Sequence, residues 1–134
     1  MGVSNVFFGF VDRTEIPRIQ ADASALVLAL PTGNGNLCLP SKMTSYMLSS
    51  RPIIASVDRD SATTRYIHES DCGISVIPDD IDALSDGFKQ IAEMSSEERH
   101  KMGANGRLFA EQHLTRKVNL QKVCDMVIRN LKHI

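Results

Sequence analysis

The sequence predicts an α/β fold in which a parallel sheet of about four strands is flanked by helices. Short apolar or β-rich runs recur along the chain, and a segment with helical features follows each of them. Two further helical segments close the chain. Alternation of strand and helix is the pattern that crossover connections between parallel strands produce. The length of 134 residues fits one domain.

The first expected unit is a strand followed by a short helix. Residues 5–10 (NVFFGF) are β-rich, and Gly9 interrupts them, so we expect the strand to end near Gly9. A helix over 15–21 is expected next, begun by Thr14 and tolerating Pro17 in its first turn.

The second expected strand is 25–30 (ALVLAL), a continuous apolar run that Pro31 closes. Such a run is typical of a strand buried on both faces. The glycine-containing loop 32–39 follows, and a helix over 40–49 begins with proline.

The third and fourth expected strands are 52–57 (PIIASV) and 73–77 (GISVI), of the same buried type. The helix between them is expected to have Asp60 or Ser61 as its N-cap, and Gly73 is expected to end that unit.

Three more helices complete the pattern. In the first, Leu84, Phe88 and Ile91 are spaced by four and three residues. Ser95 and Glu98 form a capping-box pattern ahead of the second. The inner faces of the last two helices are expected to carry Met102, Phe109 and Ala110, and then Leu120, Val123, Cys124, Val127 and Leu131.

The composition argues against several functional classes. The net charge is −1 and the charges are mixed along the chain, so we expect no nucleic-acid partner. The three cysteines match no zinc or redox spacing, and no histidine spacing suggests a metal, so we expect no metal and reduced thiols in a cytoplasmic protein. No apolar run approaches the ~20 residues that span a bilayer, and no signal peptide is apparent.

In open parallel sheets, ligands bind outside the carboxyl ends of the strands. The end of the second expected strand has the most features suited to a ligand, because loop 32–39 leads there into Pro40, Ser41 and Lys42 at a helix start. Free N–H groups and a lysine at such a start suit a diphosphate. Lysine in a first turn is otherwise unfavourable by about 0.3–1 kcal/mol. The spacing is neither a Walker loop nor G-x-G-x-x-G, so an ordinary strand-to-helix loop is the alternative.

Several stretches resemble a known family: NVFFGFVDRTEIPRI, ADASALVLALPT, CLPSKMTSYMLSSRPIIASVDRDS, CGISVIPDDIDAL and EERHKMGANGR. From about Asn5 to Leu131, the chain resembles the C-terminal domain of the group 1 (family four) retaining glycosyltransferases. The stretch PSKMTSYMLSSRPIIAS is similar to the subgroup that acts in surface polysaccharide and O-antigen synthesis. The resemblance implies part of a GT-B fold, which pairs two Rossmann-like domains. The C-terminal domain binds the nucleotide diphosphate of the donor sugar, the N-terminal domain mostly binds the acceptor, and no metal or other cofactor is needed.

The resemblance also implies a set of donor-binding residues, while the catalytic residues stay unassigned. Gly9, Phe10 and Val11 match the family segment that borders the nucleotide base. Residues 34–39, with Asn34, Gly35, Asn36 and Leu37, match the loop that faces the diphosphate and the donor sugar. Pro40, Ser41 and Lys42 match the helix start beneath the phosphates. Leu37 and Ser45 fall where many family members have the two glutamates of an E-x7-E motif. Ser45 can still hydrogen-bond a ribose hydroxyl, whereas Leu37 cannot replace a carboxylate.

In the family, further strand–helix units and the whole acceptor domain precede the equivalent of Asn5. We therefore expect residues 1–134 to be a single partial domain of a hexosyltransferase-type parent, inactive alone, as a piece, a split-gene product or a remnant. Its partners would be the nucleotide-sugar, the missing acceptor domain, and further copies associating through an exposed sheet edge. The parent's position at the inner face of the membrane stays open. The alternatives are a non-catalytic nucleotide-binding or assembly module and, with less support, a GT-B sugar-nucleotide epimerase.

Overall fold

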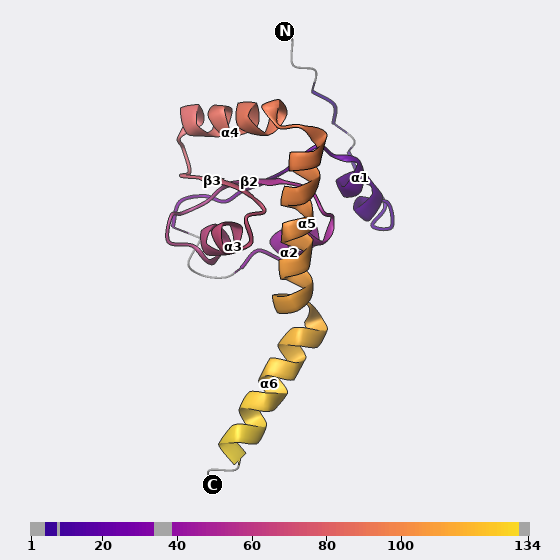
Figure 1. The fold of residues 1–134 in the computed structure, drawn as a ribbon, viewed down its shortest axis with the longest axis vertical. Coiled ribbons are helices and arrows are strands. Elements are labelled where there is room, and N and C mark those ends of the chain that lie inside the picture. The colour runs from indigo at the N-terminus through magenta and orange to yellow at the C-terminus, as the bar shows by residue number, and fades with distance from the viewer. Residues whose placement is uncertain (1–4, 8, 34–38, 132–134) are drawn as a thin grey trace.

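The structure, a computed structural model, describes residues 5–7, 9–33 and 39–131. It is an α/β fold in which helices flank a three-stranded parallel sheet in a Rossmann-like arrangement (Figure 1). In chain order the elements are α1 (Ile16–Asp22), β1 (Leu26–Ala29), α2 (Ser41–Leu48), β2 (Ile53–Ser56), α3 (Ala62–Ser70), β3 (Gly73–Val76), α4 (Ile81–Glu93), α5 (Ser96–His113) and α6 (Arg116–Leu131).

The sheet has the order β1-β2-β3, with β2 in the centre. Ile53 of β2 lies opposite Leu26 of β1 and opposite Gly73 of β3. A Cβ at Gly73 would lie 1.9 Å from the carbonyl oxygen of Ile53, so only glycine permits this approach of the strands. Gly73 therefore begins β3, which confirms the expected start of strand 73–77, but Gly73 does not cap the preceding helix. Asp71, with φ 51° in the left-handed region, is the C-cap residue of α3.

The strand expected at 5–10 is absent from the described residues 5–7, 9 and 10. Phe7 and Phe10 are almost wholly exposed, at 94% and 109% of their reference areas. A short β-rich run forms a strand only where a neighbouring strand pairs with it, and here none of the described segments does. The sheet consequently has three strands, and β1 forms one of its edges.

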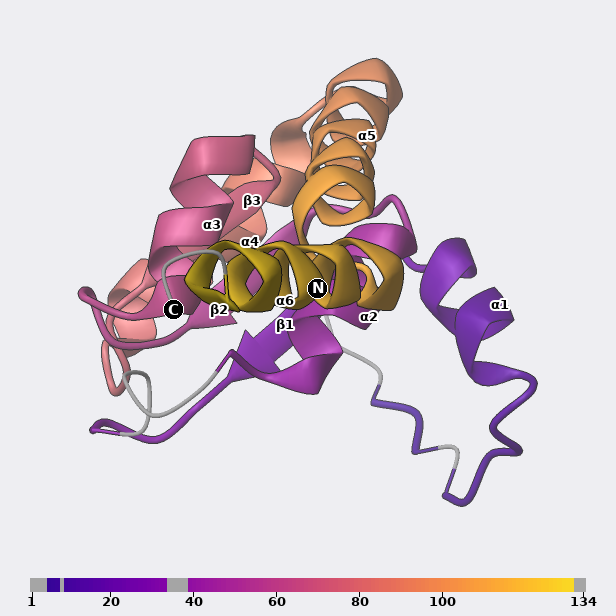
Figure 2. The ribbon, with the colours of Figure 1, turned by 90° about the horizontal axis from the view of Figure 1, so that it is seen from below.

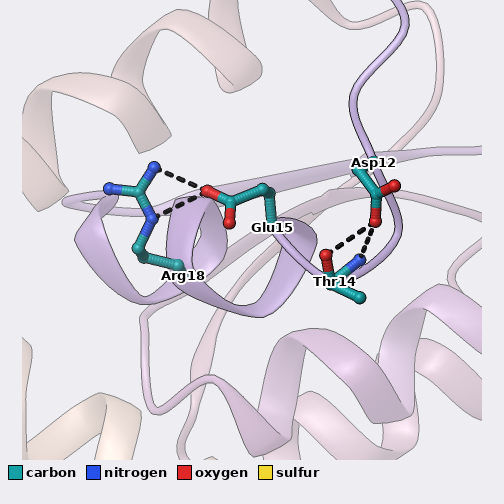
Figure 3. Close-up of polar contacts among 4 residues, drawn as sticks. All are labelled: Asp12, Thr14, Glu15 and Arg18. Atoms are coloured by element: carbon teal, nitrogen blue, oxygen red, sulfur yellow. Dashed lines mark hydrogen bonds and ion pairs between the residues drawn. The ribbon is translucent and has the colours of Figure 1, made fainter.

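The expected helix over 15–21 is confirmed as α1, displaced by one residue, but Thr14 does not cap it. The N-H and hydroxyl of Thr14 instead donate to the Asp12 carboxylate, at 2.8 and 2.6 Å (Figure 3). These two bonds hold the pKa of Asp12 below its ordinary value. Glu15 occupies the N-cap position and pairs with Arg18 at 2.7 Å.

The expectation that strand 25–30 is buried on both faces is wrong. In β1 only Leu28 is buried, and the side chain of Val27 is 43% exposed. The strand is exposed because β1 lies at the edge of the sheet, and no further strand or helix of the described structure covers its free side. By contrast, Ile53, Ile54 and Ala55 of the central strand β2 are fully buried.

Helix starts follow the local sequence closely. Of the two N-cap candidates for α3, Ser61 is the one used, and its hydroxyl accepts from Thr64 N at 3.1 Å. The expected capping box of α5 is confirmed. Ser95 Oγ accepts from Glu98 N at 3.2 Å, and Glu98 Oε2 accepts from Ser95 N at 2.7 Å.

Helices cover both faces of the sheet, with α4 on one face and α2 and α3 on the other (Figure 1). The core between the sheet, α2, α3 and α5 is aliphatic and sulfur-rich, and includes Met43, Met47, Ile53, Ile67, Cys72 and Ala110. Helix α5 lies close to α2 and to the turn that follows it because of its glycines. A Cβ at Gly103 would lie 2.1 Å from Ser50 O. The expected inner face of α5 is confirmed, with Ala110 buried and Met102 and Phe109 half-buried.

Helix α6 departs from the expected packing. It extends beyond the lower end of α5, away from the sheet layers (Figure 1), and none of its residues is buried. The apolar stripe that was expected to face the core is exposed instead: Leu120, Val123, Cys124, Val127 and Leu131. Among the helices of the described ranges, none is both long enough and apolar enough to cross a membrane.

Candidate functional site

The loops that follow the three strands meet at one edge of the sheet, as parallel strands require. Thr32 and Gly33 follow β1, Asp58 follows β2, and Asp79 follows β3. The N–H of Gly33 donates to Asp58 Oδ2 at 2.9 Å, and the hydroxyl of Thr32 lies 3.4 Å from Asp79 Oδ2. These contacts position the first residues of the glycine-containing loop against its neighbours.

Asp58 also closes the turn into α3. Its backbone carbonyl accepts from Ser61 N at 3.1 Å and from the hydroxyl of Thr64 at 2.9 Å. The residue therefore joins β2, α3 and the loop after β1. Through these contacts Asp58 positions the loop after β1 and the turn into α3 relative to each other.

The start of α2 differs chemically from the starts of α3, α4 and α5. Those three helices have side-chain caps from Ser61, Asp80 and Ser95. Helix α2 has Pro40 at its N-cap position, no side-chain cap bond and no acidic residue in its first turn.

Two backbone donors at this helix start consequently have no partner among the described residues. The N–H of Met43 donates to Pro40 O at 2.9 Å, but none of the described residues accepts from the N–H groups of Ser41 and Lys42. Ser41 and Lys42 are both exposed. An uncapped N-terminus with a lysine in its first turn is positive at short range and can hold an anion.

A groove runs along α2 where α1 packs beside it. Its polar lining comes from three helices: Gln20 of α1, Ser41, Thr44 and Ser45 of α2, and Arg107 of α5, with Ser49 just after α2. The hydroxyls of Ser45 and Ser49 both donate to Gln20 Oε1, each at 2.9 Å. Ser45 therefore has a structural partner, and its oxygen keeps the capacity to accept a further hydrogen bond.

Sequence reasoning missed Arg107 as part of this groove. Its NH1 group donates to Leu48 O at 3.3 Å, and its Nε donates to Glu111 Oε1 at 2.8 Å. The contact to Leu48 joins residues 59 positions apart. No local pattern marks such a pairing, because it depends on how closely α5 crosses α2.

The residues predicted from the family resemblance are only partly brought together. Ser41 and Ser45 share the groove, and Pro40 and Lys42 belong to the same helix start. The segment with Gly9, Phe10 and Val11 lies beside α1, away from the loops that follow the strands (Figure 2). Asn34, Gly35, Asn36 and Leu37 lie outside the described residues.

A second hollow lies at the β3 edge, between α3 and α4. Polar groups in its lining include Arg59, Thr64, His68, Ser75 and Asp80. His68 Nε2 and Ser75 Oγ are 3.4 Å apart. The hollow carries one guanidinium and one imidazole, and sequence spacing alone had not connected them.

The described part of the chain contains no group of three or more His, Cys, Asp or Glu side chains placed to hold a metal ion. Comparison of the chain with protein-family models, with curated proteins and with solved structures found no match.

Proposed function

We propose that this chain is the nucleotide-sugar donor-binding part of a retaining GT-B glycosyltransferase that acts in polysaccharide or glycoconjugate biosynthesis. The resemblance of the sequence motifs supports the proposal. The observation that carries it is the uncapped start of α2, where none of the described residues accepts from the N–H groups of Ser41 and Lys42, in a strand–loop–helix unit of a parallel sheet.

In this proposal the donor diphosphate lies at the start of α2. The N–H groups of Ser41 and Lys42 and the ammonium group of Lys42 neutralise phosphate oxygens. The same groups stabilise the negative charge that grows on the leaving diphosphate as the bond to the sugar breaks. Fixed donors do this without reorganising when the charge appears.

The carboxylates of Asp58 and Asp79 limit where the phosphates lie. Both follow strands of the same sheet edge, and both accept hydrogen bonds from the loop after β1. Like charges repel at short range, so the diphosphate is expected on the α2 side of that loop. The ribose then extends toward the groove, where the Ser45 oxygen and the Gln20 amide are available.

Titration by NMR with uridine diphosphate and guanosine diphosphate tests the proposal. We expect concentration-dependent shifts of the Ser41, Lys42 and Ser45 amides. Lys42→Ala is expected to weaken binding about tenfold, since it removes one charge-assisted contact. Lys101→Ala, which removes another exposed lysine on α5, is the matched control and is expected to bind as the parent chain does.

Two results would contradict the proposal. One is that neither nucleotide changes the chemical shift of any amide in α2. Shifts confined to the hollow around Arg59 and His68, unaffected by Lys42→Ala, would place nucleotide binding at a different site.

A non-catalytic nucleotide-binding module is the second candidate function. The observation that favours it is Ser45, which has no carboxylate to hold a ribose and whose hydroxyl is engaged by Gln20 at 2.9 Å. Replacing it tests the point: Ser45→Glu is expected to tighten nucleotide binding if the family geometry is retained. No gain in affinity favours the non-catalytic module.

A further inference from the structure

Helix α6 presents an apolar stripe that nothing in the described structure covers. The side chains of Leu120, Val123, Val127 and Leu131 are 53%, 56%, 51% and 63% exposed, and Cys124 is also exposed. Figure 1 shows the helix standing clear of the sheet layers along most of its length. A helix of 16 residues without buried side chains is only marginally stable in water. The stripe therefore calls for a partner surface.

The spacing of the stripe is that of a helix-pairing seam. Leu120, Cys124, Val127 and Leu131 follow one another at intervals of four, three and four residues. Intervals of four and three average about 3.5 residues, which keeps one row of side chains facing a partner helix. The stripe thus fits another helix better than it fits a flat surface.

Between Leu120 and Leu131, the charges of α6 lie away from this seam. The positions beside the seam are uncharged: Gln121, Val123, Ile128 and Asn130. Lys122, Asp125 and Arg129 lie on the opposite side of the helix at 100° per residue. Over residues 120–131, two copies of α6 can therefore meet along the seam without bringing like charges together.

We propose that α6 pairs with α6 of a second copy of this chain, antiparallel, so that the seam of each copy covers the other. In this register Leu120 lies opposite the second copy's Leu131, and Cys124 lies opposite the second copy's Val127. All four seam residues of each helix are then covered, as a two-fold interface requires.

The antiparallel direction follows from the charges at the start of the helix. Arg116 and Lys117 lie in its first turn. Parallel pairing would bring these cations of both copies to the same end, whereas antiparallel pairing separates them by about 24 Å of helix. It also sends the two sheet domains to opposite ends of the paired helices. The absence of an aromatic residue in α6 argues against a membrane surface as the occupant.

Light scattering and sedimentation over a concentration series test this pairing with adjacent substitutions. Val127→Asp places a charge in the seam and is expected to weaken dimerisation at least about tenfold. Met126→Asp, on an equally exposed apolar residue outside the seam, is the matched control and is expected to change the dissociation constant less than about twofold. Both residues are exposed, so neither substitution disturbs the sheet domain.

Thiol cross-linking tests the register. In a Cys38→Ser background, Val127→Cys places a new thiol opposite Cys124 of the second copy, and mild oxidation is expected to produce a covalent dimer. The antiparallel register sets Cys124 opposite Val127 rather than opposite itself, so the same background without Val127→Cys is expected to cross-link poorly.

Three results would overturn the pairing. One is a monomer at the millimolar concentrations of NMR. Another is that Met126→Asp and Val127→Asp weaken dimerisation equally. The third is a monomer whose α6 becomes protected only by vesicles containing phosphatidylserine, which would make a lipid surface the occupant.

Discussion

The carboxylate of Asp58 accepts a hydrogen bond from the backbone N–H of Gly33 at 2.9 Å. This contact joins the end of β2 to the loop after β1, 25 residues earlier in the chain. Gly33 has φ 86°, a conformation that glycine adopts without strain. The loop leading toward α2 is thus fixed at its first residues by a carboxylate from the next strand.

Removing that carboxylate is expected to destabilise the fold. Asp58→Ala loses a charged acceptor from a partly exposed position, so we expect a loss of about 1–2 kcal/mol in the free energy of unfolding. Asp58→Asn keeps an acceptor and is expected to lose less. Urea denaturation gives the values, and Asp60→Ala, at an exposed neighbouring acid, is the control expected to stay within about 0.5 kcal/mol. Equal losses for Asp58→Ala and Asp60→Ala would contradict this role.

Two glycines, Gly73 and Gly87, are expected to respond in opposite directions to alanine. At Gly73 the added Cβ would lie 1.9 Å from Ile53 O, so β2 and β3 would have to separate, and we expect a loss of at least about 3 kcal/mol. At Gly87 in α4 the added Cβ would lie 3.6 Å from the nearest methyl group, an ordinary contact. Gly87→Ala is therefore expected to stabilise the helix by up to about 1 kcal/mol. Thermal unfolding of both variants checks the pair, and destabilisation of similar size at both sites would be the contrary result.

Features decided by a few neighbouring residues could be predicted from the sequence. The capping box of Ser95 and Glu98 needs only the two side chains and one turn of helix. The expectation that the apolar run 52–57 is a buried strand is also confirmed, with Ile53, Ile54 and Ala55 fully buried.

Features decided by distant parts of the chain could not be predicted in this way. Residues 5–7 and 25–30 have similar strand propensity, but only the second run pairs with a neighbouring strand. The stripe of α6 has helical periodicity whether or not a partner covers it, so periodicity alone assigned it wrongly to the core. Arg107 reaches the groove at α2 only because Gly103 and Gly106 allow α5 to cross closely.

Acid is expected to weaken the start of α5 through Glu98. The hydrogen bonds from Ser95 hold the pKa of the Glu98 carboxyl below its ordinary value of 4.5. A carboxyl whose pKa is lower in the folded state contributes stability above the unfolded-state pKa and loses it as the pH falls through the folded-state pKa. Glu98→Gln is therefore expected to flatten the acid limb of the stability curve, with Glu97→Gln as the control in the same turn. Identical acid limbs for the parent chain and Glu98→Gln would contradict the expectation.

The two described cysteines are expected to differ sharply in reactivity. Cys72 is fully buried in the core, and burial raises the pKa of its thiol, whereas Cys124 is exposed on α6. Because the thiolate is the reacting form, a thiol-specific reagent at pH 8 is expected to modify Cys124 readily and Cys72 only after unfolding. In a Cys38→Ser background, one thiol per chain is expected to react in buffer and two in denaturant.

The dependence of the Cys124 reaction rate on protein concentration separates pairing from simple exposure. Dimers formed through α6 cover Cys124 and slow its reaction as the protein concentration rises. A Cys124 rate independent of concentration, with Val127→Asp no faster than the parent chain, would show that α6 stays uncovered.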